Sequence, residues 1–158
     1  MTPKPASHPE VLGELALALL HLQGAMAEKI QELTAPYGQT PARWKVMAAA
    51  AGDPRTVPQI ARRMGLTRQA VQRLANELVA DGLARFAPNP DHKLSPYLLL
   101  TRRGRKLEEK ITGGYHRWCH RFASGTDGRR LKAATRTLRD LTERLEAERP
   151  GKGTKRHA

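Results

Sequence analysis

Apolar residues recur every three or four positions along most of the chain, which is the spacing of amphipathic helices. The longest such stretch extends from Glu10 to Leu33. Its apolar stripe consists of Leu12, Leu15, Leu19, Leu22, Met26, Ile30 and Leu33. At a rise of ~1.5 Å per residue, this helix would be about 36 Å long. Since one small domain cannot cover so long a stripe, we expect part of it to pack against a second chain.

A second helix is predicted after a threonine–proline pair. Thr40 is a suitable N-cap, and Pro41 suits the first helical position because its missing N–H would have no partner there. The Gly52-Asp53-Pro54 turn ends this helix. Its inner face is expected to hold Trp44, Met47, Ala48 and Ala51.

Two short helices separated by a glycine turn follow, which is the arrangement of a helix-turn-helix. Thr56 and Gln59 form a capping box that begins the first helix, and Gly65 ends it. Thr67 is the N-cap of the second helix, which we expect over 68–80. Its buried side should hold Val71, Leu74, Ala75 and Leu78.

A β-hairpin is predicted next, because two short apolar runs flank a loop that contains prolines. The strands are expected at Leu83–Phe86 and Tyr97–Leu100, with a long tip over 87–96.

Two more helices complete the pattern. Thr101 caps the first, in which Gly113 and Gly114 should weaken or kink the backbone. Its stripe holds Leu107, Ile111, Tyr115, Trp118 and Phe122. The stripe of the last helix is Leu131, Ala134, Leu138, Leu141 and Leu145, a spacing that favours helix–helix pairing.

The expected fold is therefore mainly α-helical with a small β-hairpin wing. A winged helix-turn-helix DNA-binding domain would occupy residues 40–101. Helices over 10–35 and 102–148 would flank it as a dimerisation region, with flexible termini at 1–9 and 149–158.

The distribution of charged residues indicates what kind of partner this fold binds. The chain has 28 Lys and Arg against 15 Asp and Glu, and residues 54–106 alone hold 11 of the basic and 3 of the acidic residues. A basic middle segment suggests contact with a polyanion, although a basic surface can also serve solubility. The chain has no unbroken run of 18 apolar residues, no apolar leader and a single cysteine, so we expect a cytoplasmic protein without a membrane span or an internal disulfide.

The helix over 68–80 carries the candidate chemistry. If Val71 faces inward, Gln69, Gln72, Arg73 and Asn76 point the opposite way at 100° per residue, and Arg68 lies at the flank. Arginine can bond bidentately to guanine, and glutamine or asparagine to adenine. The one nearby acid, Glu77, is expected to lie off this face. The alternative is an ordinary polar helix surface.

The hairpin adds a second group of candidate DNA contacts. These are Arg85 on the first strand and Asp91, His92 and Lys93 at the tip, which could reach the backbone or a minor groove. Five further arginines are either phosphate contacts or plain surface: Arg55, Arg62, Arg63, Arg102 and Arg103.

Three other groups of residues are candidate sites. His116, Cys119 and His120 share one helix face, but a fourth zinc ligand is missing nearby, so we expect no metal. Cys119 could act as a redox switch only through a bond between subunits. His21 and Trp44 could line an effector pocket between the long helices and the DNA-binding domain, although core packing is the simpler role of Trp44.

The stretch from Val57 to Gly104 resembles the winged helix-turn-helix of the MarR family of bacterial regulators. The run ADGLARF, NPD and LTRRG is its most specific part, and the flanking helices extend the resemblance over roughly 10–148. The chain departs from the family at the wing tip, where Asp91-His92-Lys93 stands in place of Asp-x-Arg. Lysine lacks the bidentate fork of arginine.

The resemblance implies a homodimer whose terminal helices interlock and whose two winged domains bind a pseudo-palindromic site in double-stranded DNA. It also implies a repressor that is released by a small aromatic or anionic effector, with no cofactor. The alternative is a basic architectural DNA-binding protein without an effector. We do not expect an enzyme, because the sequence presents no nucleophile–base set.

Overall fold

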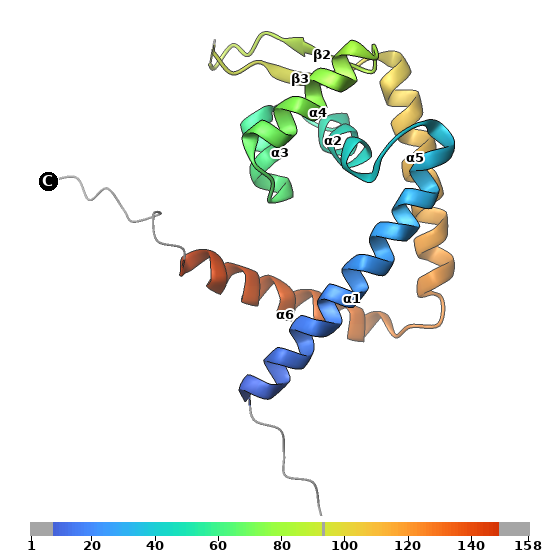
Figure 1. Cartoon of the computed structure of the whole chain (residues 1–158), viewed down its shortest axis with the longest axis vertical. Coiled ribbons are helices and arrows are strands. Elements are labelled where there is room, and N and C mark those ends of the chain that lie inside the picture. Colours follow the sequence, from blue (N-terminus) through green and yellow to red (C-terminus); the bar gives the residue numbers. More distant parts are fainter. Residues whose placement is uncertain (1–7, 93, 149–158) are drawn as a thin grey trace, which may run out of the picture. The chain divides into compact units, whose positions relative to one another are not determined.

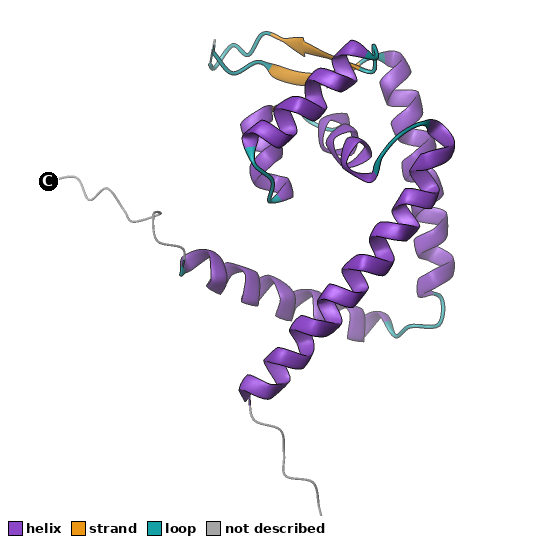
Figure 2. Cartoon of the chain, in the orientation of Figure 1, coloured by secondary structure: helices purple, strands orange, loops and turns teal. Residues whose placement is uncertain are grey.

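The computed structural model describes residues 8–92 and 94–148. Helices dominate, and a small sheet lies at one end of the winged region (Figures 1 and 2). The elements are α1 (His8–Thr34), η1 (Ala35–Tyr37), α2 (Pro41–Ala51), β1 (Arg55–Thr56), α3 (Val57–Met64), α4 (Arg68–Ala80), β2 (Ala84–Ala87), β3 (Tyr97–Leu100), α5 (Arg102–Ala123) and α6 (Gly128–Ala147). The predicted fold class is confirmed. The flexible segments proposed at the two ends fall largely outside the described residues, but His8 and Pro9 belong to α1.

The chain divides into two compact units, Met1–Arg117 and Trp118–Ala158. The first contains α1 to β3 and most of α5, and the second contains the end of α5 and α6. The predicted division into a DNA-binding part over 40–101 and a dimerisation part around it stays a prediction.

Side-chain caps set where the helices of the winged region begin. The Thr40 hydroxyl accepts a hydrogen bond from the backbone N–H of Arg43, and the Thr67 hydroxyl accepts one from that of Ala70, both at 3.2 Å. Thr56 and Gln59 form the expected capping box. These contacts satisfy N–H groups that lack a partner in the first helical turn, so all three predicted caps are confirmed.

The sheet has three antiparallel strands in the order β1-β3-β2. β3 pairs along its length with β2, from Ala84 opposite Leu100 to Ala87 opposite Tyr97. The predicted hairpin is confirmed, with β2 starting one residue later than expected. β1 was not predicted, because its two residues, Arg55 and Thr56, are too few for an alternating pattern.

One apolar core joins the winged region. Its largest fully buried side chains there come from α2, α3, α4 and β3: Met47, Ile60, Leu78, Leu98, Val46 and Val71. The predicted buried face of α4 is confirmed. In α2 the prediction was wrong for Ala48, which is exposed, while Val46 and Ala49 are buried. The reason is that α2 packs against α1, α3, α4 and β3 and so buries more than a single stripe.

α5 continues through Gly113 and Gly114, so these glycines do not interrupt the helix, and the predicted kink stays a prediction. A smaller core cluster supports the helix here, with Ile111 packed beside Ile30 of α1 and Trp44 of α2. Tertiary packing of this kind outweighs the weak helix propensity of glycine.

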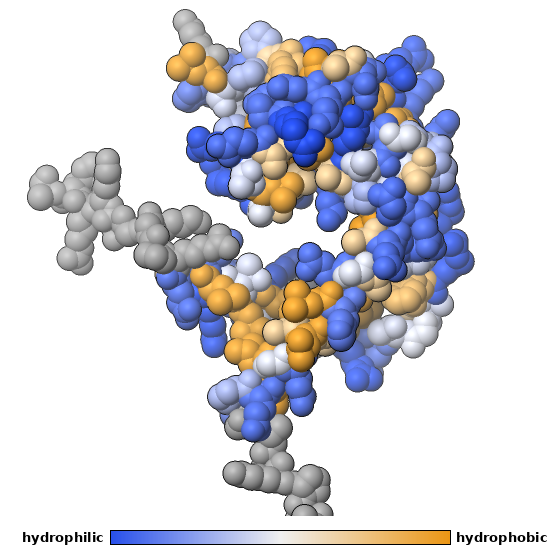
Figure 3. Space-filling model, viewed as in Figure 1, coloured by the Kyte–Doolittle hydropathy of each residue, from blue (hydrophilic) through white to orange (hydrophobic). Residues whose placement is uncertain are grey.

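α1 exposes much of its apolar surface (Figure 3). Its exposed large residues are Val11, Leu12, Leu17, Leu20 and Leu22. By length and composition alone, the helical stretch His8–Tyr37 is apolar enough to cross a membrane. A single helix of this kind near the start of a chain is weak support for a membrane span, since helices of soluble proteins pass the same test.

Candidate nucleic-acid interface

The outer face of α4 is polar and open to solvent. Gln69, Gln72, Arg73 and Asn76 are all exposed, and Arg68 is exposed at the first position of the helix. Val71, Leu74, Ala75 and Leu78 face the core on the opposite side. The helix is therefore oriented as the sequence predicts, with the candidate base-reading residues pointing away from the protein.

Two amides on this face hold each other in place. Asn76 lies one helical turn beyond Gln72. The Nε2 atom of Gln72 donates a hydrogen bond to Oδ1 of Asn76 at 2.9 Å. The bond leaves the Gln72 carbonyl oxygen as an acceptor and the Asn76 amide nitrogen as a donor. A free acceptor and a free donor on adjacent turns suit the edges of bases in a major groove.

Arg73 is engaged by an acid that was expected to lie off the face. Its Nη1 atom is 2.7 Å from Oε1 of Glu77, one turn along α4. Residues four apart on a helix are neighbours, so the expected separation of Glu77 from Arg73 was wrong. The Arg73 side chain remains 70% exposed, and its other N–H groups point to no partner among the described residues.

A half-buried arginine from α2, Arg43, contacts the other carboxylate oxygen of Glu77. Arg43, whose side chain is 12% exposed, lies 3.5 Å from Glu77 Oε2 and also forms an ion pair with Asp81 at the end of α4. Its Nε atom donates to Gln39 Oε1 at 2.9 Å. This network ties α4 to α2. Arg43 was not predicted to take part, because its partners lie 34 and 38 residues away along the chain.

The wing is organised around one buried asparagine. Asn89 donates from Nδ2 to the Ser95 carbonyl oxygen and accepts from the Asp91 N–H, both at 3.0 Å. The carboxylate of Asp91 accepts from the Tyr97 hydroxyl at 3.5 Å. Asp91 therefore has a partner within the wing. Asn89 was not predicted as a wing residue, although its place in the NPD run marks an Asx turn.

The other predicted wing residues that the structure describes are exposed to solvent. Arg85 on β2 and His92 at the tip are exposed, and Lys93 lies outside the described residues. Leu94, which the sequence analysis passed over, is 91% exposed beside them.

A cleft of about 410 Å³ separates α4 from the wing. Arg68, Gln69 and Gln72 line it from the helix, and Leu94, Ser95 and Pro96 line it from the wing. The predicted contacts on α4 thus border this hollow, whereas the predicted wing contacts Arg85, Asp91 and His92 do not line it. A nucleic-acid strand that lies in such a cleft can meet the helix on one side and the wing on the other.

The five remaining arginines differ in their surroundings. Arg55 is held by the Ala49 carbonyl oxygen at 2.9 Å, so it has a structural role. Arg62 and Arg63 are exposed on α3. Arg102 and Arg103 begin α5, and Arg103 donates to the Asp81 carbonyl oxygen at 3.1 Å, at the opposite end of α4 from Arg68.

A second cavity, of about 530 Å³, lies between α1, α2 and α5. Trp44 lines it together with Tyr115, and their ring centroids are 5.2 Å apart. The indole N–H of Trp44 donates to the Thr112 hydroxyl at 3.0 Å. His21, the other residue proposed for an effector pocket, is exposed and does not line this cavity.

The candidate metal and thiol residues lie on α5. In the part of the chain that the structure describes, no group of three or more His, Cys, Asp or Glu side chains is arranged to hold a metal ion, and this includes His116, Cys119 and His120. Cys119 is a half-buried free thiol.

Comparison with known proteins places this geometry in context. A sequence model of the MarR family matches residues 37–93, from η1 to the wing tip. The uncharacterized protein Rv2011c of Mycobacterium tuberculosis (strain H37Rv) is 40% identical over 139 residues, which cover 88% of this chain and 97% of that protein.

Solved structures share the fold at low identity. The MarR family transcription regulator SP03579 superposes with a TM-score of 0.76 at 22% identity, covering 89% of this chain and 96% of that one. The Staphylococcus aureus MarR in complex with salicylate and kanamycin gives a TM-score of 0.76 at 13% identity, over 88% and 95% of the two chains. With a family model that spans the helix-turn-helix and a relative that aligns over nearly its full length, the chain belongs to the MarR family of transcription regulators.

Proposed function

We propose that this protein acts as a homodimer on a pseudo-palindromic site in double-stranded DNA and represses transcription until a small effector binds. The family is one of DNA-binding transcription regulators and not of enzymes. The observation that carries the proposal is the exposed face of α4. There, Gln69, Gln72 and Arg68 border a cleft that the wing lines on its other side. Base edges in a major groove are read by these residue types.

Dimerisation is supported by apolar surface that the single chain leaves uncovered. α1 exposes five large apolar residues, and Leu17 and Leu20 are each more than half exposed. In the second unit, Phe122 is 70% exposed and Leu145 65%. A second copy of the chain would bury such residues, and in a helix-turn-helix dimer it would place the two recognition helices about 34 Å apart.

Effector release is supported by the cavity between α1, α2 and α5. Its volume of about 530 Å³ and its aromatic lining, Trp44 and Tyr115, suit a small aromatic compound. The cavity borders α2, and α2 packs against α4, so a ligand can favour one placement of the reading helix over another. Couplings of this kind amount to ~1–3 kcal/mol. The S. aureus MarR structure contains salicylate, a compound of the expected class.

Selection of bound sites from random duplex DNA tests the DNA-binding part. We expect a palindromic consensus that is bound at least ~10³-fold more tightly than random sequence. The same selection with Arg73→Ala should lose preference at one base pair of each half-site. Arg129→Ala, which removes the same charge from an exposed position on α6, should leave the consensus unchanged.

Three outcomes would contradict the proposal. Recovery of no consensus would favour a basic architectural protein of the cytoplasm. Sedimentation as a single chain at working concentration would remove the dimer. For the effector, salicylate and related aromatic acids would be titrated against the protein–operator complex, and an affinity that none of them changes would remove effector release.

A further inference from the structure

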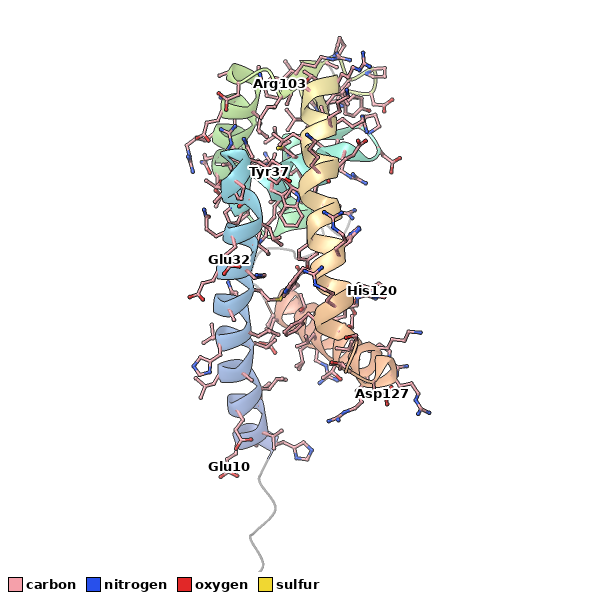
Figure 4. The ribbon with its side chains drawn as sticks, turned by 90° about the vertical axis from the view of Figure 1, so that its right-hand side faces the viewer. Glu10, Glu32, Tyr37, Arg103, His120 and Asp127 are labelled. Carbon is pink, nitrogen blue, oxygen red and sulfur yellow. The ribbon has the colours of Figure 1, made fainter. Side chains whose placement is uncertain are left out.

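A third hollow in the structure is lined by four cationic side chains and two residues that are aromatic or apolar. It has a volume of about 730 Å³ and lies between η1 and the N-terminal half of α5. Its lining consists of Tyr37, Arg102, Arg103, Lys106, Leu107 and Lys110. Four of these side chains are cations and none is a carboxylate. In Figure 4 the labelled Tyr37 and Arg103 lie at the same end of the paired helices α1 and α5.

The placement of these cations is unfavourable in the free protein. Arg102, Lys106 and Lys110 follow one another at four-residue steps, so like charges are neighbours along one face of α5. The first turn of α5 contains no acidic residue, although the positive end of the helix dipole disfavours cations there. None of these three side chains forms an ion pair with an acid in residues 8–92 or 94–148. A bound anion would offset both effects.

The rest of the lining indicates what else such an anion contains. Tyr37 is 42% exposed, and its ring together with half-buried Leu107 provides an aromatic and apolar wall. The volume falls within the ~300–1,000 Å³ typical of small-molecule sites. Arginine matches phosphate through paired N–H donors, and Arg103 keeps donors free beyond the one that binds Asp81.

DNA bound at the proposed interface would not fill this hollow. Arg103 contacts the C-terminal end of α4, whereas Arg68, Gln69 and Gln72 lie in its N-terminal half. Figure 1 shows the start of α5 and the tip of the wing at opposite ends of the β2–β3 hairpin. The hollow is also separate from the cavity that Trp44 lines.

We propose that the hollow between η1 and α5 binds a small ring compound with several phosphate groups, of the nucleoside polyphosphate class. The four cations take the phosphates, and Tyr37 and Leu107 contact the ring. The inference does not rest on the proposed base-reading face of α4 or on the wing, because no residue of either lines the hollow.

Calorimetric titration of the full chain with ATP tests this site. We expect ATP to bind and adenosine not to bind. The double variant Lys106→Ala/Lys110→Ala should lower the ATP affinity about tenfold or more, since it removes two charged partners. The matched control is Lys132→Ala/Arg136→Ala, an exposed pair on α6 with the same four-residue spacing, which should change the affinity less than ~2-fold.

Tyr37→Ala separates the ring contact from the charges. It should weaken ATP while leaving inorganic triphosphate unchanged. An equal loss for both probes would overturn the assignment of the ring to Tyr37.

Three results would overturn the proposed site. They are a lack of ATP binding at ~1 mM, adenosine binding as tightly as ATP, and an equal loss of ATP affinity in the two double variants. The affinity for duplex DNA is measured as a separate test. Lys106→Ala/Lys110→Ala should bind DNA as the parent does, and a loss of DNA affinity as large as the loss of ATP affinity would mean that these lysines contact DNA instead.

Discussion

Gly104 marks the closest approach between α5 and the base of the wing. A Cβ atom added at this position would lie 1.8 Å from the Leu83 carbonyl oxygen and 2.8 Å from its carbonyl carbon. Leu83 is 2% exposed, and its carbonyl oxygen accepts from the Thr101 N–H at 3.0 Å. Because the obstacle is buried backbone, it cannot rotate away as a flexible side chain would.

The cost of Gly104→Ala follows from this geometry. A normal contact of 3.4 Å requires the helix and Leu83 to separate by about 1.6 Å, which would stretch the Thr101–Leu83 hydrogen bond beyond its range. Overpacking costs ~1–3 kcal/mol, and the lost bond adds ~0.5–1.5 kcal/mol. The better helix propensity of alanine returns up to ~1 kcal/mol. We therefore expect a net loss of about 1–4 kcal/mol in the free energy of unfolding.

Thermal unfolding followed by circular dichroism measures this loss. At ~2–4 °C per kcal/mol for a chain of this size, Tm should fall by about 2–16 °C. Gly114→Ala is the matched control on the same helix, because its added Cβ would meet Leu33 Cδ2 at an ordinary 3.9 Å. It should leave Tm unchanged or raise it. If the two variants unfold at the same temperature, the close approach at Gly104 does not constrain the wing.

Five further substitutions test the candidate DNA interface on α4 and the wing. Thr67→Ala removes the cap of α4 and should lower stability by ~1 kcal/mol in urea unfolding, whereas Thr67→Ser should restore it. Arg73→Ala should weaken binding to the selected DNA site by ~1–3 kcal/mol in a fluorescence titration; unchanged affinity would mean that Arg73 does not read a base. Glu77→Gln frees Arg73 from its ion pair, so binding to random DNA should rise and the specificity ratio should fall; a higher ratio would refute this role. Lys93→Ala should weaken all duplexes alike and flatten the salt dependence by one phosphate contact, and a loss confined to one sequence would contradict that.

The sequence predicts most of the winged region because its signals are local. Threonine caps and the 3.6-residue period act over a few positions, and Thr67 with Val71 was enough to orient α4 correctly. Features that depend on distant residues were missed. Arg43 meets its partners only after the chain has folded back, and the exposure of Ala48 reflects which elements surround α2.

The same distinction applies to the candidate site. Which α4 side chains face outward follows from helix geometry, but the pairing of Gln72 with Asn76 and of Arg73 with Glu77 depends on chosen rotamers. The hollow beside Tyr37 lies between η1 and α5, two segments more than 60 residues apart in the sequence. The charge pattern therefore identified Arg102 and Arg103, but it could not identify the aromatic wall beside them.

The bond between Gln72 and Asn76 has a consequence for the genetics of the target promoter. If Gln72 and Asn76 read adjacent bases as proposed, each amide fixes the other's orientation, so a base change opposite one should reorient both. Effects of mutations at two adjacent positions of a half-site should therefore not add, and a compensating pair of base changes should restore binding that either change alone abolishes.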